Sequence, residues 1–137
     1  LGRRRREEAV RELDKITSSK AVFQIMQPII GELPHEEFWV LYLNNSNKLI
    51  YKSQLSKGGL VGTVVDTRLV YKTALEHSAV AIILTHNHPS GALQASGADK
   101  QVTRQLQNAG NTLDIKVLDH VIITEHSYLS FADEGFL

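Results

Sequence analysis

A run of seven residues, AVAIILT at positions 79–85, constrains the fold of this 137-residue chain more than any other feature. It holds six apolar residues and a threonine without a polar interruption, which is typical of a strand buried on both faces. Such strands lie in α/β sheets that helices cover on both sides. His86, Asn87 and His88 follow at once, and ligands usually bind at the carboxyl ends of strands in open α/β sheets. The run therefore predicts a layered α/β domain with a polar site where the strand ends.

The segments on either side alternate between extended and helical patterns. Residues 36–56 have a hydrophobic period of two around the sequence NNSN, which predicts a β-hairpin. Helical patterns cover residues 1–16, 20–33, 68–78 and 96–113, the last ending near Gly110, and extended patterns cover 58–67, 114–124 and the start of 127–137. We therefore expect a three-layer-like fold, a mixed β-sheet flanked by helices.

The length suits one main domain, which we place at residues 34–137. Residues 1–33 are interpreted as a helical segment, the tail of a linker to a missing upstream domain, because the chain opens without a methionine. The run Arg3 to Arg6 could contact phosphates, but neighbouring glutamates favour a solvated helix face.

Composition excludes several classes of protein. Fifteen basic and fifteen acidic residues cancel, so no overall charge favours nucleic acid or an anionic membrane. No apolar run approaches the roughly 20 residues that span a bilayer, and we expect a cytoplasmic protein without membrane contact. Cysteine is absent, so any metal site must use His, Asp or Glu.

The segment THNHPSGALQASGADK at 85–100 has the spacing of such a site. On an extended backbone, residues i and i+2 point the same way, so His86 and His88 can reach one point. Ser96 and Asp99 then fall at the start of the next helix, where their spacing also fits a capping box. Capping and ligation are compatible, because a helix start brings both side chains to one place. Two histidines and a carboxylate suit a catalytic zinc with water as fourth ligand, although iron, cobalt and nickel accept the same donors.

This spacing, His-x-His followed by Ser-x-x-Asp, resembles the JAMM (MPN-plus) metalloprotease motif. Together with LDH at 118–120, HNHPSG at 86–91 resembles the RadC family within that superfamily, over roughly residues 36–137. The resemblance implies a cytidine deaminase-like architecture and one zinc ion held by His86, His88 and Asp99. It also implies that Ser96 binds the developing oxyanion or positions the water.

The resemblance further implies a glutamate general acid/base near the start of the first sheet strand. Glu36 and Glu37 are both candidates, and strand alternation puts them on opposite faces without saying which face meets the zinc. We favour Glu36, because the family glutamate stands two residues before an aromatic, here Phe38.

Three further residues have two open interpretations. Asp119 and His120 lie in an apolar strand, where a structural role or support of a ligand from behind is favoured over direct ligation; Asp119 could accept the second N–H of a ligating histidine. Arg68 keeps one position of the family's P-R-E and either contacts the site or starts a helix. The family's D-P-x-P-S is replaced by ALQAS at 92–96, which removes two stiffening prolines.

These features predict a zinc-dependent hydrolase that cleaves a peptide or isopeptide bond in a protein or peptide substrate. The alternative is a DNA-associated accessory protein of repair or recombination, with a structural or vestigial zinc and DNA contacted indirectly through a missing N-terminal domain. A third hypothesis is hydrolysis of a non-peptide amide or a nucleobase, because zinc deaminases also pair zinc with a glutamate. They normally use cysteine ligands, which this chain lacks, and the third hypothesis is therefore disfavoured.

Overall fold

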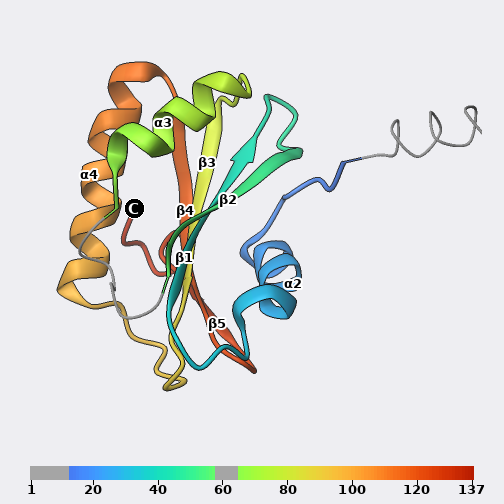
Figure 1. The fold of residues 1–137 in the computed structure, drawn as a ribbon, viewed down its shortest axis with the longest axis vertical. Coiled ribbons are helices and arrows are strands. Elements are labelled where there is room, and N and C mark those ends of the chain that lie inside the picture. The colour runs from blue at the N-terminus through green and yellow to red at the C-terminus, as the bar shows by residue number, and fades with distance from the viewer. Residues whose placement is uncertain (1–12, 58–64) are drawn as a thin grey trace, which may run out of the picture.

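A computed structural model describes residues 13–57 and 65–137 (Figure 1). The helices are α2 (Ser19–Ile30), α3 (Thr67–Glu76) and α4 (Gly97–Leu113), and the strands are β1 (Glu37–Leu43), β2 (Leu49–Lys57), β3 (Ala81–Asn87), β4 (Lys116–Ile123) and β5 (Tyr128–Ser130). The five strands form one sheet in the order β2-β1-β3-β4-β5. β3 and β4 are parallel and the other pairs are antiparallel, so the predicted mixed sheet is confirmed.

The apolar run becomes the central strand β3, in which every residue is buried. It begins and ends two residues later than the run itself, so that His86 and Asn87 belong to the strand. The hairpin also forms as predicted, with β1 and β2 paired antiparallel. β3 lies between β1 and β4, so a neighbouring strand flanks its carboxyl end on each side.

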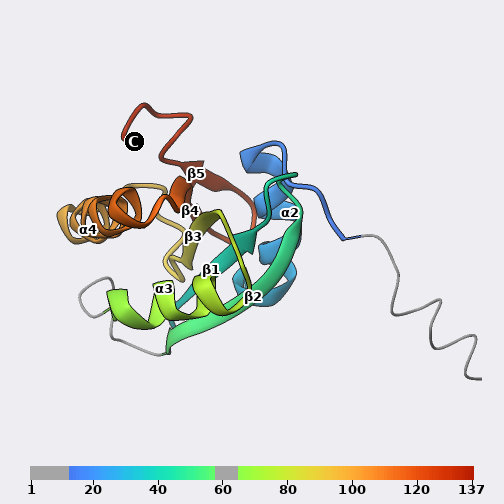
Figure 2. The same cartoon turned by 90° about the horizontal axis from the view of Figure 1, so that it is seen from above.

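Helices cover both faces of the sheet, as the view from above shows (Figure 2). On one face, α3 and α4 pack on Phe38, Val40 and Tyr42 of β1, and on the other face Leu41 and Leu43 lie in the cluster that includes α2. The predicted alternation of β1 is therefore found. α2 begins at the cap Ser18, includes Pro28, and buries Val22, Met26 and Ile30. The division of the chain at residue 33 stays a prediction, and α2, which precedes it, covers one face of the sheet.

Three predictions fall on residues 1–12 and 58–64, which lie outside the described residues: the one for Arg3 to Arg6 falls there entirely and the two others in part. At the end of the predicted helix over 1–16, the chain is extended instead: Lys15 bridges Lys48, and Ile16 N–H donates to the carbonyl of Asn47. Backbone pairing with the hairpin outweighs local helix propensity there. Of the extended segment predicted over 58–67, Asp66 is the cap of α3, and its carboxylate accepts the N–H of Arg68.

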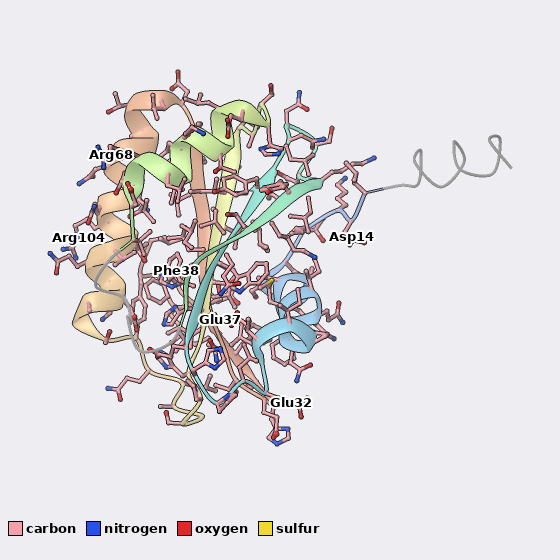
Figure 3. The ribbon with its side chains drawn as sticks, viewed as in Figure 1. Asp14, Glu32, Glu37, Phe38, Arg68 and Arg104 are labelled. Carbon is pink, nitrogen blue, oxygen red and sulfur yellow. The ribbon has the colours of Figure 1, made fainter. Side chains whose placement is uncertain are left out.

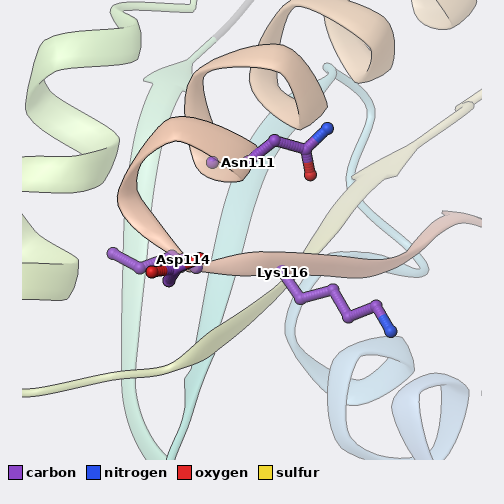
Figure 4. A pocket seen from close by; sticks show the side chains of 5 residues that line it. Asn111, Asp114 and Lys116 are labelled. Carbon is purple, nitrogen blue, oxygen red and sulfur yellow. The ribbon is translucent and has the colours of Figure 1, made fainter.

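The predicted end of the last helix at Gly110 is wrong. α4 continues to Leu113 and ends at Asp114, which takes the left-handed conformation with φ of 56°. A Cβ at Gly110 would collide with the carbonyl of Ile115 and the hydroxyl of Tyr71. Glycine is therefore needed for close packing inside the helix and does not end it. Beyond it, Asn111, Asp114 and Lys116 line a shallow pocket of about 240 Å³ (Figure 4).

None of the helices within 13–57 and 65–137 is both long and apolar enough to cross a bilayer.

Candidate metal centre

The predicted site lies where β3 ends, β1 begins and α4 begins. Phe38 at the start of β1 is paired with His86, and His86 is paired on its other side with Ile122 near the end of β4. His86 therefore projects from the sheet toward the layer of α3 and α4, on the same face as Phe38. Three chain segments that are distant in sequence supply side chains to one small volume.

The structure brings His86, His88 and Asp99 together. One ligand atom from each lies within 4.8 Å of the others. The Nε2 atoms of the two imidazoles are 3.0 Å apart, and each faces a different carboxylate oxygen of Asp99, at 3.3 Å from His86 and 3.6 Å from His88. The i, i+2 spacing on an extended backbone is what makes the two rings converge.

Asp99 is held by the helix that it starts. Its carboxylate accepts the N–H of Ser96 at 2.9 Å and its own N–H donates to the Ser96 hydroxyl at 3.0 Å, so the predicted capping box is present. Burial disfavours ionisation of this carboxyl, but the imidazoles of His86 and His88 outweigh burial and hold its pKa well below its ordinary value. The group is thus an anion in a place that water hardly reaches, since only 1% of Asp99 is exposed.

The loop after β3 fixes the ring of His88. Its Nδ1 lies 2.8 Å from the carbonyl of Ala92, which can only accept, so Nδ1 carries the proton and Nε2 offers its lone pair. Gly91, with φ of 83°, closes the turn by donating to the carbonyl of His88. The neighbouring carboxylate of Asp99, 3.6 Å from Nε2, is the main cause that raises the pKa of His88, because it stabilises the charged imidazolium. These contacts order the loop where the family's prolines are missing.

Glu36 faces the cluster and Glu37 does not. One Glu36 carboxylate oxygen is 3.9 Å from His88 Nε2, and the other is buried without a hydrogen-bond partner among the described residues. Burial raises the pKa of Glu36. The Glu37 carboxylate instead lies 2.8 Å from His35 Nε2 and accepts the Trp39 indole N–H at 3.0 Å. The placement favours Glu36 as general acid/base, and its role stays a prediction.

Asn87, interpreted from the sequence only as a loop residue that makes hydrogen bonds, holds the backbone on both sides of Glu36. Its side-chain oxygen accepts the N–H of Glu37 at 2.7 Å, and its amide nitrogen donates to the carbonyl of His35 at 2.9 Å. Only 1% of Asn87 is exposed. The residue between the two histidines thus points to the opposite face and fixes the segment that carries Glu36. No sequence pattern marked this contact, because its partners are some 50 residues away.

We expect Asn87→Ala to destabilise the fold by about 2 kcal/mol, because it leaves a buried N–H and a carbonyl without partners. Thermal unfolding measures the loss. Asn111→Ala, at an exposed position of α4, is the matched control and should change stability by less than about 0.5 kcal/mol. Equal melting temperatures for the two variants would contradict the role assigned to Asn87.

The ring of His120 contacts the ring nitrogen of His86 that faces away from the cluster, whereas Asp119 makes no hydrogen bond to His86 among the described residues. The Nε2 of His120 is 2.8 Å from Nδ1 of His86, and its Nδ1 is 2.6 Å from the hydroxyl of Thr103 on α4. Its ring is buried between Phe38 and Phe131, and this burial holds the pKa of His120 well below its ordinary value. Thr103 was not predicted from the sequence.

The carboxylate of Asp119 binds β5 and the turn that follows it. It accepts hydrogen bonds from the Ser130 hydroxyl at 2.6 Å and from the N–H groups of Ala132 and His120. These contacts tie β4 to β5 and the following turn, and they use the carboxylate that we had considered as a partner for a ligating histidine. The structure therefore supports the structural interpretation of Asp119.

Arg68 is not brought to the cluster. It projects outward from α3 (Figure 3), its side chain is 93% exposed, and its contact is Asp66 at 3.6 Å. The second residue of α3 therefore fits the interpretation as part of a helix start.

An open pocket of about 560 Å³ lies against the cluster. Glu36 and His88 line it together with residues of the loop and the start of α4, namely Ser90, Ala92, Gln94, Ala95, Ser96 and Gly97. A substrate in this pocket would contact both the predicted general acid/base and a predicted ligand.

The residues present fit a metal ion. Two imidazole nitrogens and a carboxylate form a donor set that divalent metals accept. One carboxylate oxygen of Asp99 is buried and makes no hydrogen bond within the described part of the chain, although buried polar atoms are almost always satisfied. A cation at this point would satisfy that oxygen and lie between it and the two Nε2 atoms. The cluster of His86, His88 and Asp99 could thus bind a metal ion.

A five-stranded mixed sheet between helices, with these side chains where β3 ends and α4 begins, is the architecture of a JAB/MPN-type domain. The model of the RadC-like JAB domain family matches residues 16–136, and the chain belongs to this family. The resemblance found in the sequence is confirmed.

Two curated proteins have sequences similar to that of this chain. A UPF0758 protein of Flavobacterium johnsoniae is 66% identical over 135 residues, which are 98% of this chain and 59% of that protein. A UPF0758 protein of Porphyromonas gingivalis is 43% identical over all of this chain and 61% of its own length. The chain thus spans about three fifths of the length of these relatives.

Proposed function

We propose that this domain is a zinc-dependent hydrolase that cleaves a peptide or isopeptide bond in a protein or peptide substrate. The observation that carries the proposal is the position of Glu36: it lies 3.9 Å from His88, beside the three candidate ligands and on the wall of an open pocket. A metal-binding cluster that served only the fold would have no need of a buried, unpaired carboxylate oxygen next to it.

His86, His88 and Asp99 would hold the ion. Zinc bound by three protein ligands supplies Lewis acidity and lowers the pKa of a coordinated water to about 7. Glu36 is placed to take up a proton at its carboxylate and to return it to a leaving amine, and its raised pKa suits both directions.

Ser96 has a hydrogen to offer on the pocket side. Its hydroxyl oxygen accepts the N–H of Asp99, so the O–H itself is not used by the capping box. A hydroxyl on the pocket wall can donate to an oxygen that becomes negative during acyl transfer. We therefore assign Ser96 to the oxyanion and Glu36 to the proton.

Glu36→Gln is expected to keep about one zinc per chain and to lose roughly 100-fold or more of the turnover, because the amide cannot exchange the proton. Zinc content by elemental analysis and cleavage of a peptide library by the same samples measure the two effects. Glu37→Gln is the matched control, since Glu37 turns to His35 and Trp39 on the other face. Full turnover in Glu36→Gln, or loss only in Glu37→Gln, would refute the assignment.

The association with DNA through an upstream segment, considered above, stays a prediction.

A further inference from the structure

A chain of buried hydrogen bonds leads from one candidate ligand back to another. It starts at Nδ1 of His86, which is 2.8 Å from Nε2 of His120, and continues from Nδ1 of His120 to the hydroxyl of Thr103 at 2.6 Å. The Thr103 hydroxyl also lies 3.0 Å from the backbone carbonyl of Asp99. The contacts therefore connect β3, β4 and α4 behind the metal cluster.

The direction of every bond in this chain follows from one group that can only accept. The carbonyl of Asp99 has no hydrogen, so Thr103 donates its single hydroxyl hydrogen to it. The Thr103 oxygen must then accept, and Nδ1 of His120 carries a proton. A neutral His120 has a bare Nε2, which accepts a proton from Nδ1 of His86. His86 is left with a bare Nε2, and this is the atom that faces His88 and Asp99.

The opposite direction gives a worse arrangement. If Thr103 donated to His120, the Asp99 carbonyl would lose this bond and Nε2 of His120 would carry the proton. Nδ1 of His86 would then accept, and Nε2 of His86 would hold a hydrogen that points into the cluster. A hydrogen on that atom excludes a metal ion. A charged His120 is disfavoured because its ring is fully buried between Phe38 and Phe131.

We propose that Thr103 and His120 are positioning residues that hold His86 in the tautomer able to ligate a metal. We call the hydrogen-bonded series from His86 through His120 and Thr103 to the Asp99 carbonyl the relay. The relay changes no net charge. It decides only which ring nitrogen of each histidine carries the proton. It also joins two ligands, because its last acceptor is the backbone carbonyl of Asp99, whose side chain belongs to the same cluster. This inference rests on the proposed metal site, and it adds two residues that touch neither metal nor substrate.

Zinc affinity, measured by competition with a chelator, tests the relay. Thr103→Val keeps the shape of the side chain and removes the hydroxyl. Because Thr103 acts on His86 through His120, we expect the affinity to fall roughly 10-fold, the lower end of the range for losing a direct outer partner of a ligating histidine. Thr103→Ser restores the hydroxyl and should stay within about threefold of the wild type. Thr112→Val is the matched control, because Thr112 makes the same kind of bond within α4, to Asn108, at an exposed position. Wild-type affinity in Thr103→Val would overturn the proposal.

Nitrogen NMR of the histidine rings in the zinc-loaded wild type tests the same proposal without a substitution, even if Thr103→Val does not fold. We expect protons at Nδ1 of both His86 and His120, and a proton at Nε2 of His120 would refute the relay. The outcomes also separate the two proposals. A wild-type protein that takes up no zinc removes the proposed function together with the relay, whereas zinc binding that ignores Thr103 removes the relay alone.

Discussion

His88→Ala is expected to lose zinc binding almost completely, with affinity reduced by more than about 100-fold. Loss of an outer partner of a ligand already weakens metal binding by 10- to 100-fold, and loss of a ligand itself should exceed that range. The other two candidate ligands remain in place, because they lie on β3 and at the start of α4. Titration with zinc against a chelator of known affinity gives the measurement.

Two further variants make this result specific. Asp99→Asn keeps an oxygen that can accept the N–H of Ser96, so it should preserve the helix start while it removes the anionic ligand. We expect it to lose zinc as His88→Ala does. His126→Ala is the control, since His126 is an exposed histidine beside Glu125. Stoichiometric zinc in either ligand variant would show that the three residues are not the ligand set.

Gly110→Val is expected to lower the free energy of unfolding by about 3 kcal/mol, the upper range for overpacking a core. The new Cβ would meet the backbone carbonyl of Ile115, which cannot move without shifting the start of β4. It would also meet the hydroxyl of Tyr71, which is held by its hydrogen bond to the carbonyl of Leu106. Thermal unfolding should show a melting temperature lower by roughly 10 °C.

Gly97→Ala gives the comparison for this prediction. Gly97 is also in α4, but a Cβ there meets nothing within 4 Å. That substitution should leave stability unchanged or raise it by about 0.5 kcal/mol, since alanine restricts the unfolded chain. If both variants melt together with the wild type, the close approach at Gly110 does not exist.

The sequence predicted the parts of the fold that depend on local pattern. Most of the apolar run became β3, which is buried throughout, because a strand covered on both faces is favoured by an uninterrupted apolar sequence. The spacing from His86 to Asp99 fitted one site because an extended strand end and a helix start each impose a fixed geometry. The preference for Glu36 over Glu37 came from resemblance, since alternation alone leaves the two faces equivalent.

What the sequence did not reveal depends on contacts between distant segments. Gly110 has the sequence appearance of a helix end, and only the approach of Tyr71 explains its place inside α4. Asn87 resembles any polar loop residue until β1 is paired with β3, which brings His35 and Glu37 to its side chain. Thr103 is a weak helix former whose partner His120 lies on a strand, and no periodicity links the two.

We propose that His86, His88 and Asp99 hold one zinc ion beside Glu36. Elemental analysis of wild-type protein purified without added metal, followed by titration of the metal-free protein with zinc, tests it most directly. The proposed function predicts about one zinc per chain before metal removal and uptake of one equivalent afterwards. Protein that contains no metal and takes up none would contradict the claim.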